Sequence, residues 1–330
     1  MLNGGNKHKN NMKIGIITTS SPIDKLQNEV IESGYKLLRE NGFNIFEHPS
    51  CRKRTGYTAG SVLTRVEAIH DLVLNPSIDI IMAFWGGDNT NQILDSLDYE
   101  LIRENPKIFI GYSDTSSLLN AIHKMTGIIT YLGPAVITFC KPEVPVDSIL
   151  NFKKFLDKNT KSVELSVPSL YAKDSYYKRD DNKRIFNKNE GWKVLREGEA
   201  LDKKIVAINL TILQSLISTP YEPEFRDRIL FCEIDESVNI QTLDRMFVQL
   251  RMTGIIDKLS GLVFSKNTDD SNIKDQDLIS VLEENIRKDI PIVYNFDCGH
   301  TDPIITIPIG GECDLHALNV NINMVIKNYV

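Results

Sequence analysis

Short apolar runs alternate with amphipathic stretches through residues 12–145. The isoleucine-rich run at 12–18 is followed by a stretch at 24–41 that repeats apolar residues at helical spacing and stops at Asn41-Gly42. Strands alternating with helices of this length predict a parallel, doubly wound α/β sheet. Further strands are expected at 43–46, 78–84, 107–110 and 127–131, and further helices at 61–74, through Leu97, and from Asp114 onward.

The pattern changes in the second half of the chain, where strands and helices no longer alternate regularly. A mixed β/α domain is therefore expected there, rather than a second doubly wound unit. Its predicted strands are 205–208, 229–232, 290–294 and several short ones from 304 to 326, its helices are 209–217, 239–252 and 276–287, and residues 255–264 are expected to be extended.

Three regions follow: an N-terminal domain at 1–145, a linker and exposed loop at 146–190, and a C-terminal domain at 191–330. Prolines and charges at 141–145 mark the exit from the first domain. Within the linker, residues 171–191 are dense in Lys, Asp, Arg, Asn and Tyr, with almost no aliphatic side chains. This composition predicts an exposed excursion and a candidate lid.

Composition narrows the class of protein. Hydrophobic residues make up 42% of the 330 residues and charged residues 25%, the balance of a soluble globular protein. The net charge of −6 gives no reason to expect nucleic acid as a partner. No apolar run approaches the ~20 residues of a membrane span, and residues 1–11 lack the apolar core of a secretory signal. Five scattered cysteines without a Cys-x-x-Cys pair favour reduced thiols and a cytoplasmic location.

Ser113 has the setting of a nucleophile. It lies between the predicted strand 107–110 and a helix start at Asp114-Thr115-Ser116, with Gly111 two residues before it. This is the layout of a nucleophile elbow, in which a tight turn exposes a serine and the helix N-terminus faces a developing oxyanion. The pattern is Gly-x-Ser-x-Thr rather than Gly-x-Ser-x-Gly, so a serine N-cap at an ordinary turn stays open.

A second loop follows the neighbouring strand 78–84 and begins Trp85-Gly86-Gly87-Asp88. Two glycines between a strand and a helix allow backbone N–H groups to face a ligand. Ligands of doubly wound sheets bind at the carboxyl ends of strands. The loop and the Ser113 turn are therefore expected to be neighbours at one site.

An activated serine needs a base and an orienting carboxylate. Of the six histidines, His300 stands apart because it follows a strand and has Gly299 before it. Glu233 follows the strand 229–232 and is the candidate carboxylate, with Asp235 and Glu236 as close rivals.

Two other chemistries fit the residues less well. Asp297, Cys298, His300 and Asp302 could ligate a metal, but no paired histidine or cysteine motif accompanies them. The turn after the first strand lacks Gly-x-Gly-x-x-Gly, and no Walker lysine motif is present, so nucleotide-cofactor binding is not expected.

Taken in order along the chain, these motifs resemble the family of LD-carboxypeptidases and microcin C self-immunity serine peptidases. The resemblance extends from about Met12 to the end. It is carried by Trp85-Gly86-Gly87-Asp88-Asn89-Thr90-Asn91, by residues 106–119 around Ser113, by Gly127 through Gly133-Pro134, by Leu230-Phe231-Cys232-Glu233 and by Gly299-His300-Thr301-Asp302-Pro303.

The resemblance implies a nucleophile at Ser113, a carboxylate at Glu233 and a base at His300. It also implies an oxyanion hole formed by the backbone N–H groups of Gly87 and Asp114. The implied fold is a flavodoxin-like N-terminal domain with a smaller mixed β/α C-terminal domain. The resemblance implies no metal and no cofactor. It does imply that the protein forms a homodimer.

Two activities occur in the family: removal of D-Ala from muropeptides, and cleavage of the amide of an aminoacyl-nucleotide. This chain resembles the immunity type more closely, and Gly86, Asp88 and Trp192 are its candidate substrate-binding residues. For Trp192, packing at the domain junction is the alternative. Ala207-Ile208 stand where many members carry two glycines; if those glycines allow close approach of the substrate, Ala207 and Ile208 would narrow the site or shift its specificity. A non-catalytic ligand-binding protein on the same fold is the alternative of another class.

Overall fold

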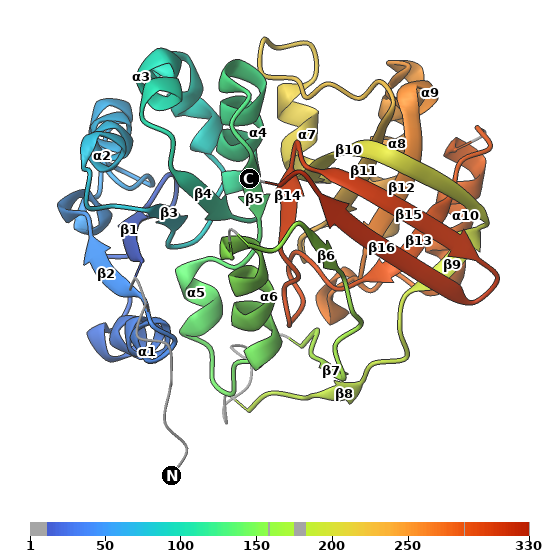
Figure 1. Ribbon diagram of the computed structural model, residues 1–330, viewed down its shortest axis with the longest axis horizontal. Helices are drawn as coiled ribbons and strands as arrows, with labels where there is room; N and C mark the ends of the chain where they lie inside the picture. The colour runs from blue at the N-terminus through green and yellow to red at the C-terminus, as the bar shows by residue number, and fades with distance from the viewer. Residues whose placement is uncertain (1–11, 158, 175–182, 287, 330) are drawn as a thin grey trace.

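Two parallel-rich sheets form the frame of the molecule, and they lie side by side in Figure 1. The computed structural model describes residues 12–157, 159–174, 183–286 and 288–329. The predicted fold class, a doubly wound α/β domain joined to a mixed β/α domain, is confirmed over these residues.

The first sheet has the strand order β14-β5-β4-β3-β1-β2. All neighbours are parallel except β14, which comes from the last quarter of the chain and pairs antiparallel with β5. The end of the chain therefore completes the first sheet. The strands are β1 (Lys13–Ile17), β2 (Asn44–Glu47), β3 (Ile80–Ala83), β4 (Ile108–Gly111), β5 (Thr130–Leu132) and β14 (Ile307–Ile309).

Helices cover both faces of this sheet, as a doubly wound fold requires (Figure 1). One layer holds α2 (Val62–Leu74), α3 (Tyr99–Glu104) and α4 (Thr115–Thr126), and the other holds α1 (Asn28–Glu40), α5 (Val136–Phe139) and α6 (Val146–Leu156). Short 3-10 turns lie at Pro49–Arg52 and Thr90–Ser96.

The second sheet has the order β6-β16-β15-β10-β11-β12-β13-β9. Its four central strands, β10 to β13, are parallel, and antiparallel strands flank them. Its strands are β6 (Ser162–Glu164), β9 (Lys193–Arg196), β10 (Gly198–Asn209), β11 (Arg228–Glu233), β12 (Leu259–Ser265), β13 (Ile292–Phe296), β15 (Glu312–Leu318) and β16 (Asn321–Lys327).

Four helices accompany this second sheet: α7 (Leu210–Leu216), α8 (Ile240–Met252), α9 (Ile255–Lys258) and α10 (Asp275–Asn285). A two-stranded ribbon, β7 (Leu170–Tyr171) with β8 (Asn187–Lys188), lies below both sheets in Figure 1, and a 3-10 turn spans Asp269–Ser271.

Helix α4 joins the two halves of the molecule. The side-chain amide of Asn120, which is 2% exposed, donates to the carbonyl oxygens of Ser116 and Ala207. The backbone N–H of Asn209, at the end of β10, donates to the hydroxyl of Ser116 over 3.3 Å. A helix of the first domain is thereby fixed to a central strand of the second.

Three predicted elements differ from the structure. The helix expected after residue 87 is instead a 3-10 turn at Thr90–Ser96, and the backbone N–H of Thr90 donates to the carboxylate of Asp114. Residues 255–258 form a helical turn after Gly254, whose φ of +72° only glycine adopts easily. Strand β10 begins at Gly198 rather than 205, since its first half is a polar stretch that pairs with β15.

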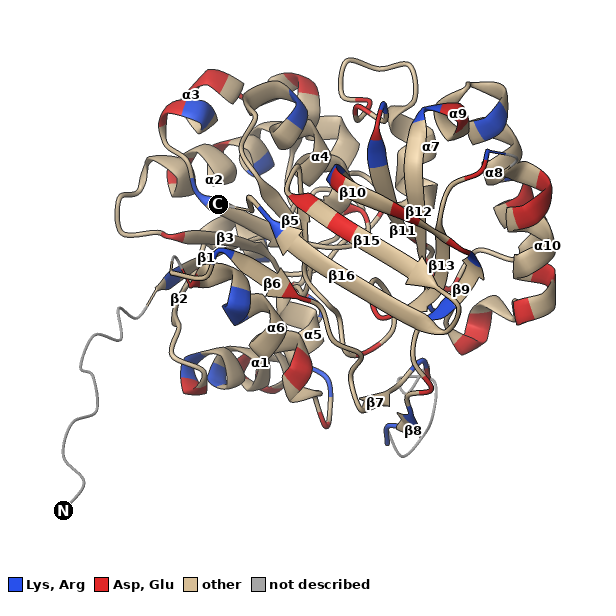
Figure 2. Ribbon diagram, turned by 45° about the vertical axis from the view of Figure 1, so that its right-hand side comes forward, with Lys and Arg blue, Asp and Glu red and all other residues tan. Residues whose placement is uncertain are grey.

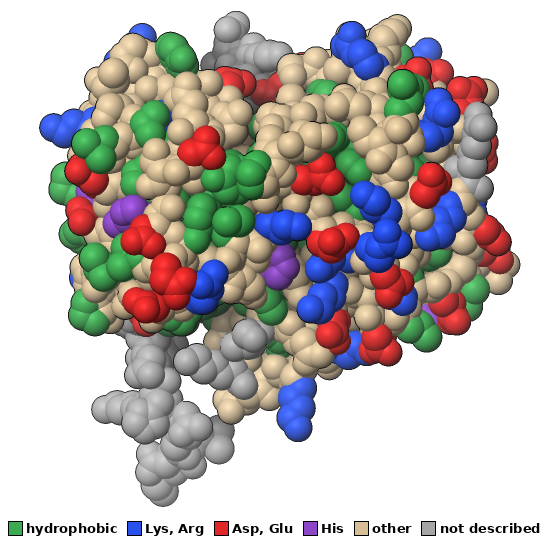
Figure 3. Space-filling view, turned by 90° about the horizontal axis from the view of Figure 1, so that it is seen from above, with side chains coloured by type: hydrophobic (Ala, Val, Ile, Leu, Met, Phe, Trp, Pro, Cys, Tyr) green, Lys and Arg blue, Asp and Glu red, His purple; other side chains and the backbone are tan. Residues whose placement is uncertain are grey.

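Acidic and basic residues are interspersed along the ribbon, and α10 carries several acidic residues (Figure 2). The face seen in Figure 3 likewise carries Lys and Arg next to Asp and Glu. None of the described helices is long and apolar enough to cross a membrane.

Replacing Asn120 with Ala is expected to lower the free energy of unfolding by about 2 kcal/mol, because the buried carbonyl group of Ala207 loses the side-chain donor that reaches it from α4. Urea unfolding measures the change. Asn105→Ala is the matched control, since within the described part of the chain the side-chain amide of Asn105 donates only to the carbonyl of Leu101, four residues earlier in α3. Equal losses in both variants would show that the α4–β10 contact contributes no more than a local bond.

Candidate active site

Ser113 occupies the sharp turn between β4 and α4. Its φ is +59°, in the left-handed region that a residue with a side chain rarely adopts. Holding a serine there costs about 1–3 kcal/mol and is typical of functional turns. The predicted strand–turn–helix around Ser113 is present, and the serine lines a cavity.

His300 lies in the turn after β13 and faces Ser113. Its Nε2 is 3.1 Å from the Ser113 hydroxyl oxygen, and its ring meets Tyr112 edge to face with centroids 5.3 Å apart. Gly299 precedes it with φ +77°, and a Cβ there would lie 2.5 Å from an oxygen of Glu233. Only glycine therefore allows the turn to approach Glu233 so closely.

Glu233 ends β11 and is fully buried. Its Oε2 is 2.7 Å from His300 Nδ1, so a proton on Nδ1 donates to the carboxylate and leaves Nε2 to accept from Ser113. The rival Asp235 instead accepts from Ser237 and Thr211. Of the three acids at 233–236, Glu233 is thus the one that the structure brings to the histidine.

The electrostatics of His300 follow from this contact. Burial works to lower the pKa of His300, but the Glu233 carboxylate, assisted by Glu236 and Asp235, raises that pKa above its ordinary value. The second oxygen of Glu233 is buried without a hydrogen-bond partner among the described residues, so little else offsets its negative charge. The carboxylate is therefore arranged to stabilise an imidazolium.

The loop at 85–89 lies directly beside Ser113. A Cβ on Gly86 would be 3.1 Å from both the Ser113 hydroxyl and the backbone nitrogen of Asp114, so the missing side chain leaves this approach open. Gly87 has φ +142°. The hydroxyl of Ser20, after β1, accepts from the backbone N–H groups of Asp88 and Asn89 and fixes the loop.

The carboxylate of Asp114 points away from the serine. It accepts from the backbone N–H and the hydroxyl of Thr90, over 2.9 and 2.8 Å. Burial raises the pKa of Asp114, while these bonds act in the opposite direction. The side chain thus holds the 85–91 loop against α4, and only the backbone of Asp114 remains for a role in an oxyanion hole.

A cavity of about 550 Å³ opens in front of Ser113 and His300. Gly86 and Gly87 lie in its wall, as predicted for a loop beside the site. The rest of the wall is mixed: Leu26, Val30, Trp85, Tyr112 and Ile137 are apolar or aromatic, and Lys141, Lys173, Asp174, Arg184, Glu236 and Asp302 are charged.

Two candidate substrate-binding residues lie outside this wall. Asp88 is exposed, and it is held through its backbone rather than its carboxylate. Trp192 is 7% exposed, packs against Phe296 with ring centroids 4.8 Å apart, and donates from Nε1 to Asp297. Asp88 and Trp192 therefore remain candidates that lie outside the wall of this cavity, and the contacts of Trp192 are those of the packing alternative.

Ala207 and Ile208 do not narrow the cavity. Both are fully buried in β10, where they pair with Phe231 and Cys232 of β11. Their side chains belong to the core rather than to the wall of the cavity. The expectation that they narrow the site therefore has no counterpart in the described cavity.

The candidate metal ligands are used otherwise. Among the described residues no three His, Cys, Asp or Glu side chains gather in a way that could hold a metal ion. Asp297 pairs with Lys266, and Asp302 pairs with Lys141 and Arg184. Within the predicted lid at 171–191, residues 175–182 lie outside the described part of the chain.

Several wall residues were not predicted from the sequence. Trp85 had a usable signal, since it immediately precedes the glycines of the 85–89 loop. No sequence signal marked Lys141 or Arg184, because each is one basic residue among many in a polar segment. Only the folded chain places them beside Ser113.

Comparison with known proteins agrees with this geometry. The LD-carboxypeptidase N-terminal domain matches residues 14–133, and the LD-carboxypeptidase C-terminal domain matches residues 204–315. The microcin C7 self-immunity protein MccF of Escherichia coli is 30% identical, over 94% of this chain and 92% of its own. The probable murein peptide carboxypeptidase of Bacillus subtilis is 29% identical, over 92% and 88%.

Solved structures show the same relationship. An MccF-like protein from Bacillus anthracis superposes with a TM-score of 0.90 at 31% identity, covering 96% of each chain. MccF in complex with glutamyl sulfamoyl guanosine superposes with a TM-score of 0.86 at 30% identity, covering 97% of each chain. The chain belongs to the LD-carboxypeptidase family and is a serine-type hydrolase, as the motifs predicted.

Gly299→Ala is expected to reduce kcat by on the order of a hundredfold, because the new methyl group displaces Glu233 or His300 by about 1 Å. Steady-state kinetics on folded protein measures the loss. Gly254→Ala is the control: its φ is also positive, at +72°, but nothing lies within 4 Å of the added Cβ. Comparable losses of kcat would contradict the role of the Gly299–Glu233 approach.

The raised pKa of His300 sets the pH dependence. Because the base must be neutral, kcat/KM should fall on the acid side with a midpoint above the ordinary histidine value of ~6.5. Glu233→Gln should move that midpoint to lower pH and reduce kcat by on the order of 10³-fold or more. Glu236→Gln, which leaves the contact with Nδ1 intact, should shift the midpoint less. An acid limb unmoved by Glu233→Gln would exclude the assigned pair.

Proposed function

We propose that this enzyme hydrolyses the amide bond of a peptidyl- or aminoacyl-nucleotide with a Ser113–His300–Glu233 triad. One observation carries the proposal. The hydroxyl, the imidazole and the carboxylate form a continuous chain of contacts of 3.1 and 2.7 Å, although they come from three separate strand ends. This is the order of contacts that nucleophilic catalysis by serine requires.

In the proposed reaction, the Ser113 oxygen attacks the carbonyl carbon and its proton passes to His300 Nε2. The carbonyl oxygen becomes an oxyanion that the backbone N–H groups of Gly87 and Asp114 stabilise. The C–N bond then breaks, and His300 returns the proton to the leaving nitrogen. Water, deprotonated by His300, hydrolyses the ester on Ser113 and regenerates the enzyme. Glu233 keeps the Nδ1 proton in place and offsets the imidazolium charge throughout.

The nature of the relatives supports the choice of substrate. MccF has been solved with glutamyl sulfamoyl guanosine, an aminoacyl-nucleotide analogue. The mixed wall of the cavity suits such a molecule, since Trp85 and Tyr112 offer apolar surface while Lys141 and Arg184 lie near the same space. Gly86 is the proposed substrate-contacting residue of the 85–89 loop.

A muropeptide LD-carboxypeptidase activity is the second candidate. It is favoured by the similarity to the murein peptide carboxypeptidase of Bacillus subtilis, which is nearly as close as the similarity to MccF. Both candidates use the same triad and differ in the acyl group bound to Ser113 and in the leaving group. A non-catalytic binding protein on this fold would lack reactivity at Ser113 altogether.

The setting proposed for the enzyme is cytoplasmic and homodimeric. All five cysteines are free and buried, which is compatible with a reducing compartment. The dimer rests on the family resemblance, and light scattering on the purified protein tests it: a mass of one chain at micromolar concentration would contradict it.

Ser113→Ala should abolish turnover, with kcat falling by at least on the order of 10⁴-fold, because the nucleophile is lost. Mass spectrometry compares wild type and variant on an aminoacyl sulfamoyl adenosine and on a muramoyl tetrapeptide. Ser215→Ala, on the exposed side of α7, is the matched control and should keep full activity.

The two substrates separate the two candidates. Release of the free amino acid from the nucleotide alone supports the first, and loss of the terminal D-Ala alone supports the second. Full activity of Ser113→Ala on either substrate would overturn the triad.

A further inference from the structure

The turn that carries His300 has a buried carboxylate near each end. Asp297 is 0% exposed and Asp302 is 2% exposed, and His300 lies between them in the chain. Neither carboxylate belongs to the Ser113–His300–Glu233 chain of contacts. Their partners come from distant segments, so they fix the turn relative to the rest of the site.

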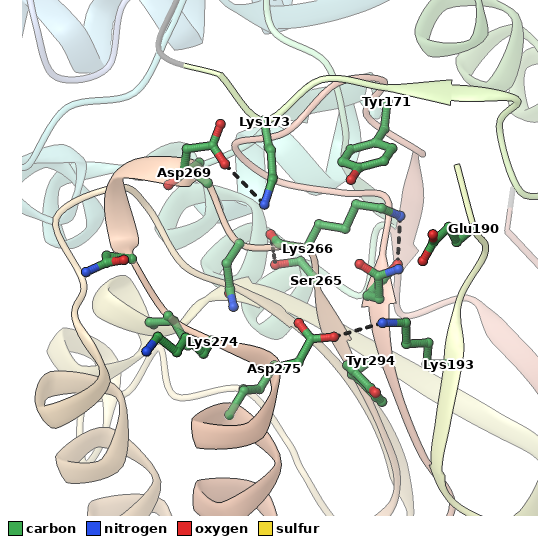
Figure 4. A pocket seen from close by; sticks show the side chains of 16 residues that line it. Tyr171, Lys173, Glu190, Lys193, Ser265, Lys266, Asp269, Lys274, Asp275 and Tyr294 are labelled. Carbon is green, nitrogen blue, oxygen red and sulfur yellow. Dashed lines mark hydrogen bonds and ion pairs between the residues drawn. The ribbon is translucent and has the colours of Figure 1, made fainter. Parts of the chain in front are cut away.

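Asp297 accepts hydrogen bonds from three side chains. The ammonium of Lys266, itself 4% exposed, is 2.7 Å from Oδ1. The indole Nε1 of Trp192 donates to Oδ2 over 2.9 Å. The amide of Asn189 donates to both oxygens, over 3.0 and 3.1 Å. Figure 4 shows Lys266 extending from the end of β12 toward the segment that holds Glu190 and Lys193.

Asp302, which lines the cavity, also accepts hydrogen bonds from basic side chains. Its Oδ2 accepts from Lys141 Nζ over 2.7 Å and from Arg184 Nη2 over 2.8 Å. Its backbone N–H and C=O both pair with Ala172, each over 2.8 Å. Arg184 also donates from Nε to Asp174 over 3.1 Å.

Four of these six partner residues lie in the segments 172–174 and 184–192, namely Ala172, Arg184, Asn189 and Trp192, whereas Lys266 and Lys141 come from elsewhere in the chain. Those segments supply Ala172, Lys173, Asp174 and Arg184 to the cavity wall. The His300 turn is therefore attached at one end, through Asp302, to residues that line the cavity. At the other end it is attached, through Asp297, to Asn189 and Trp192, which are not part of the cavity wall.

We propose that Asp297 and Asp302 are positioning residues, which hold His300 within reach of Ser113 by docking its turn on segments 172–174 and 184–192. The inference rests on the proposed triad. The placement of the base then depends on the same wall that contacts the substrate. Trp192 acts in this arrangement through Asp297 and not by contact with a substrate ring.

The physical reason is that ion pairs of this kind are a costly way to obtain stability alone. Carboxylates and ammonium groups lose hydration when they are buried. Apolar side chains of similar volume often stabilise the folded state equally or better. The ion pairs fix direction and distance, however, as apolar packing does not. The gap between His300 Nε2 and Ser113 is 3.1 Å, and proton transfer tolerates little displacement there.

A small fluorophosphonate tests this without a substrate. It forms a bond between its phosphorus and the Ser113 oxygen, fluoride leaves, and His300 takes the proton, so the labelling rate reports the Ser113–His300 geometry. Asp302→Asn should slow labelling and kcat together by about 10- to 100-fold, with KM changed less than about threefold.

Two milder variants keep the test decisive if Asp302→Asn does not fold. Trp192→Phe keeps the packing on Phe296 but removes the N–H donated to Asp297. Arg184→Lys keeps the charge but cannot hold Asp174 and Asp302 together through a planar fork. Each should slow labelling severalfold without loss of the folded state by circular dichroism.

Asp275→Asn is the matched control. It breaks the ion pair between Asp275 and Lys193, which lies in the same region as Lys266 (Figure 4). The ion pair joins α10 to β9, and neither residue belongs to the contacts that hold the turn at 297–302. This variant should label and turn over at the wild-type rate.

The outcomes are separable. If the wild type is not labelled and Ser113→Ala keeps its activity, the proposed triad fails and the inference with it. If the wild type is labelled and the folded variants at 302, 184 and 192 are labelled equally fast, the triad stands and the positioning role is overturned. A Trp192→Phe variant that changes only KM for an aminoacyl-nucleotide would also overturn it, in favour of direct contact.

Discussion

The packing of α4 against β10 is the constraint on which the site depends. Ser113 begins the turn into α4, whereas Glu233 ends β11, the parallel neighbour of β10 in the second sheet. The bonds from Asn120 to Ala207 and from Asn209 to Ser116 hold these two halves in one register. A shift of one residue along this contact would separate the serine from its histidine. The site is thus a property of the junction, and neither sheet contains it alone.

The same junction explains the electrostatics. Glu233 is buried at the end of a central strand, where water cannot offset its charge, and His300 is the group that the carboxylate contacts. A low local dielectric makes this pair stronger than it would be at the surface. The backbone around this pair has unusual geometry: Ser113 has a strained, positive φ, and Gly299 lies so close to Glu233 that a side chain there would clash.

Much of the fold could be predicted because the signals are local. The central strands β3 and β4 of the first sheet are buried on both faces, so they appear as short apolar runs, and the helices between the strands have clear periodicity. Ser113, Glu233 and His300 could each be selected because each follows such a run. The oxyanion role proposed for Gly87 and the choice of Glu233 over Asp235 required the family resemblance. For Glu233, the structure adds the contact with His300. The start of β10 and the short helix α9 were missed, since their sequences are polar or interrupted by glycine.

The sequence by itself determined the elements, their order, the class of fold and the residues suited to acyl transfer, because these depend on local periodicity and residue chemistry. Only the tertiary structure decided which residues meet. Trp192 is a buried partner of Asp297, Arg184 lies in the wall of the cavity, and β14 completes a sheet whose other strands end near residue 132. These contacts join segments that are distant in the sequence, where no local periodicity predicts them, and they are set by the packing of the two sheets through α4.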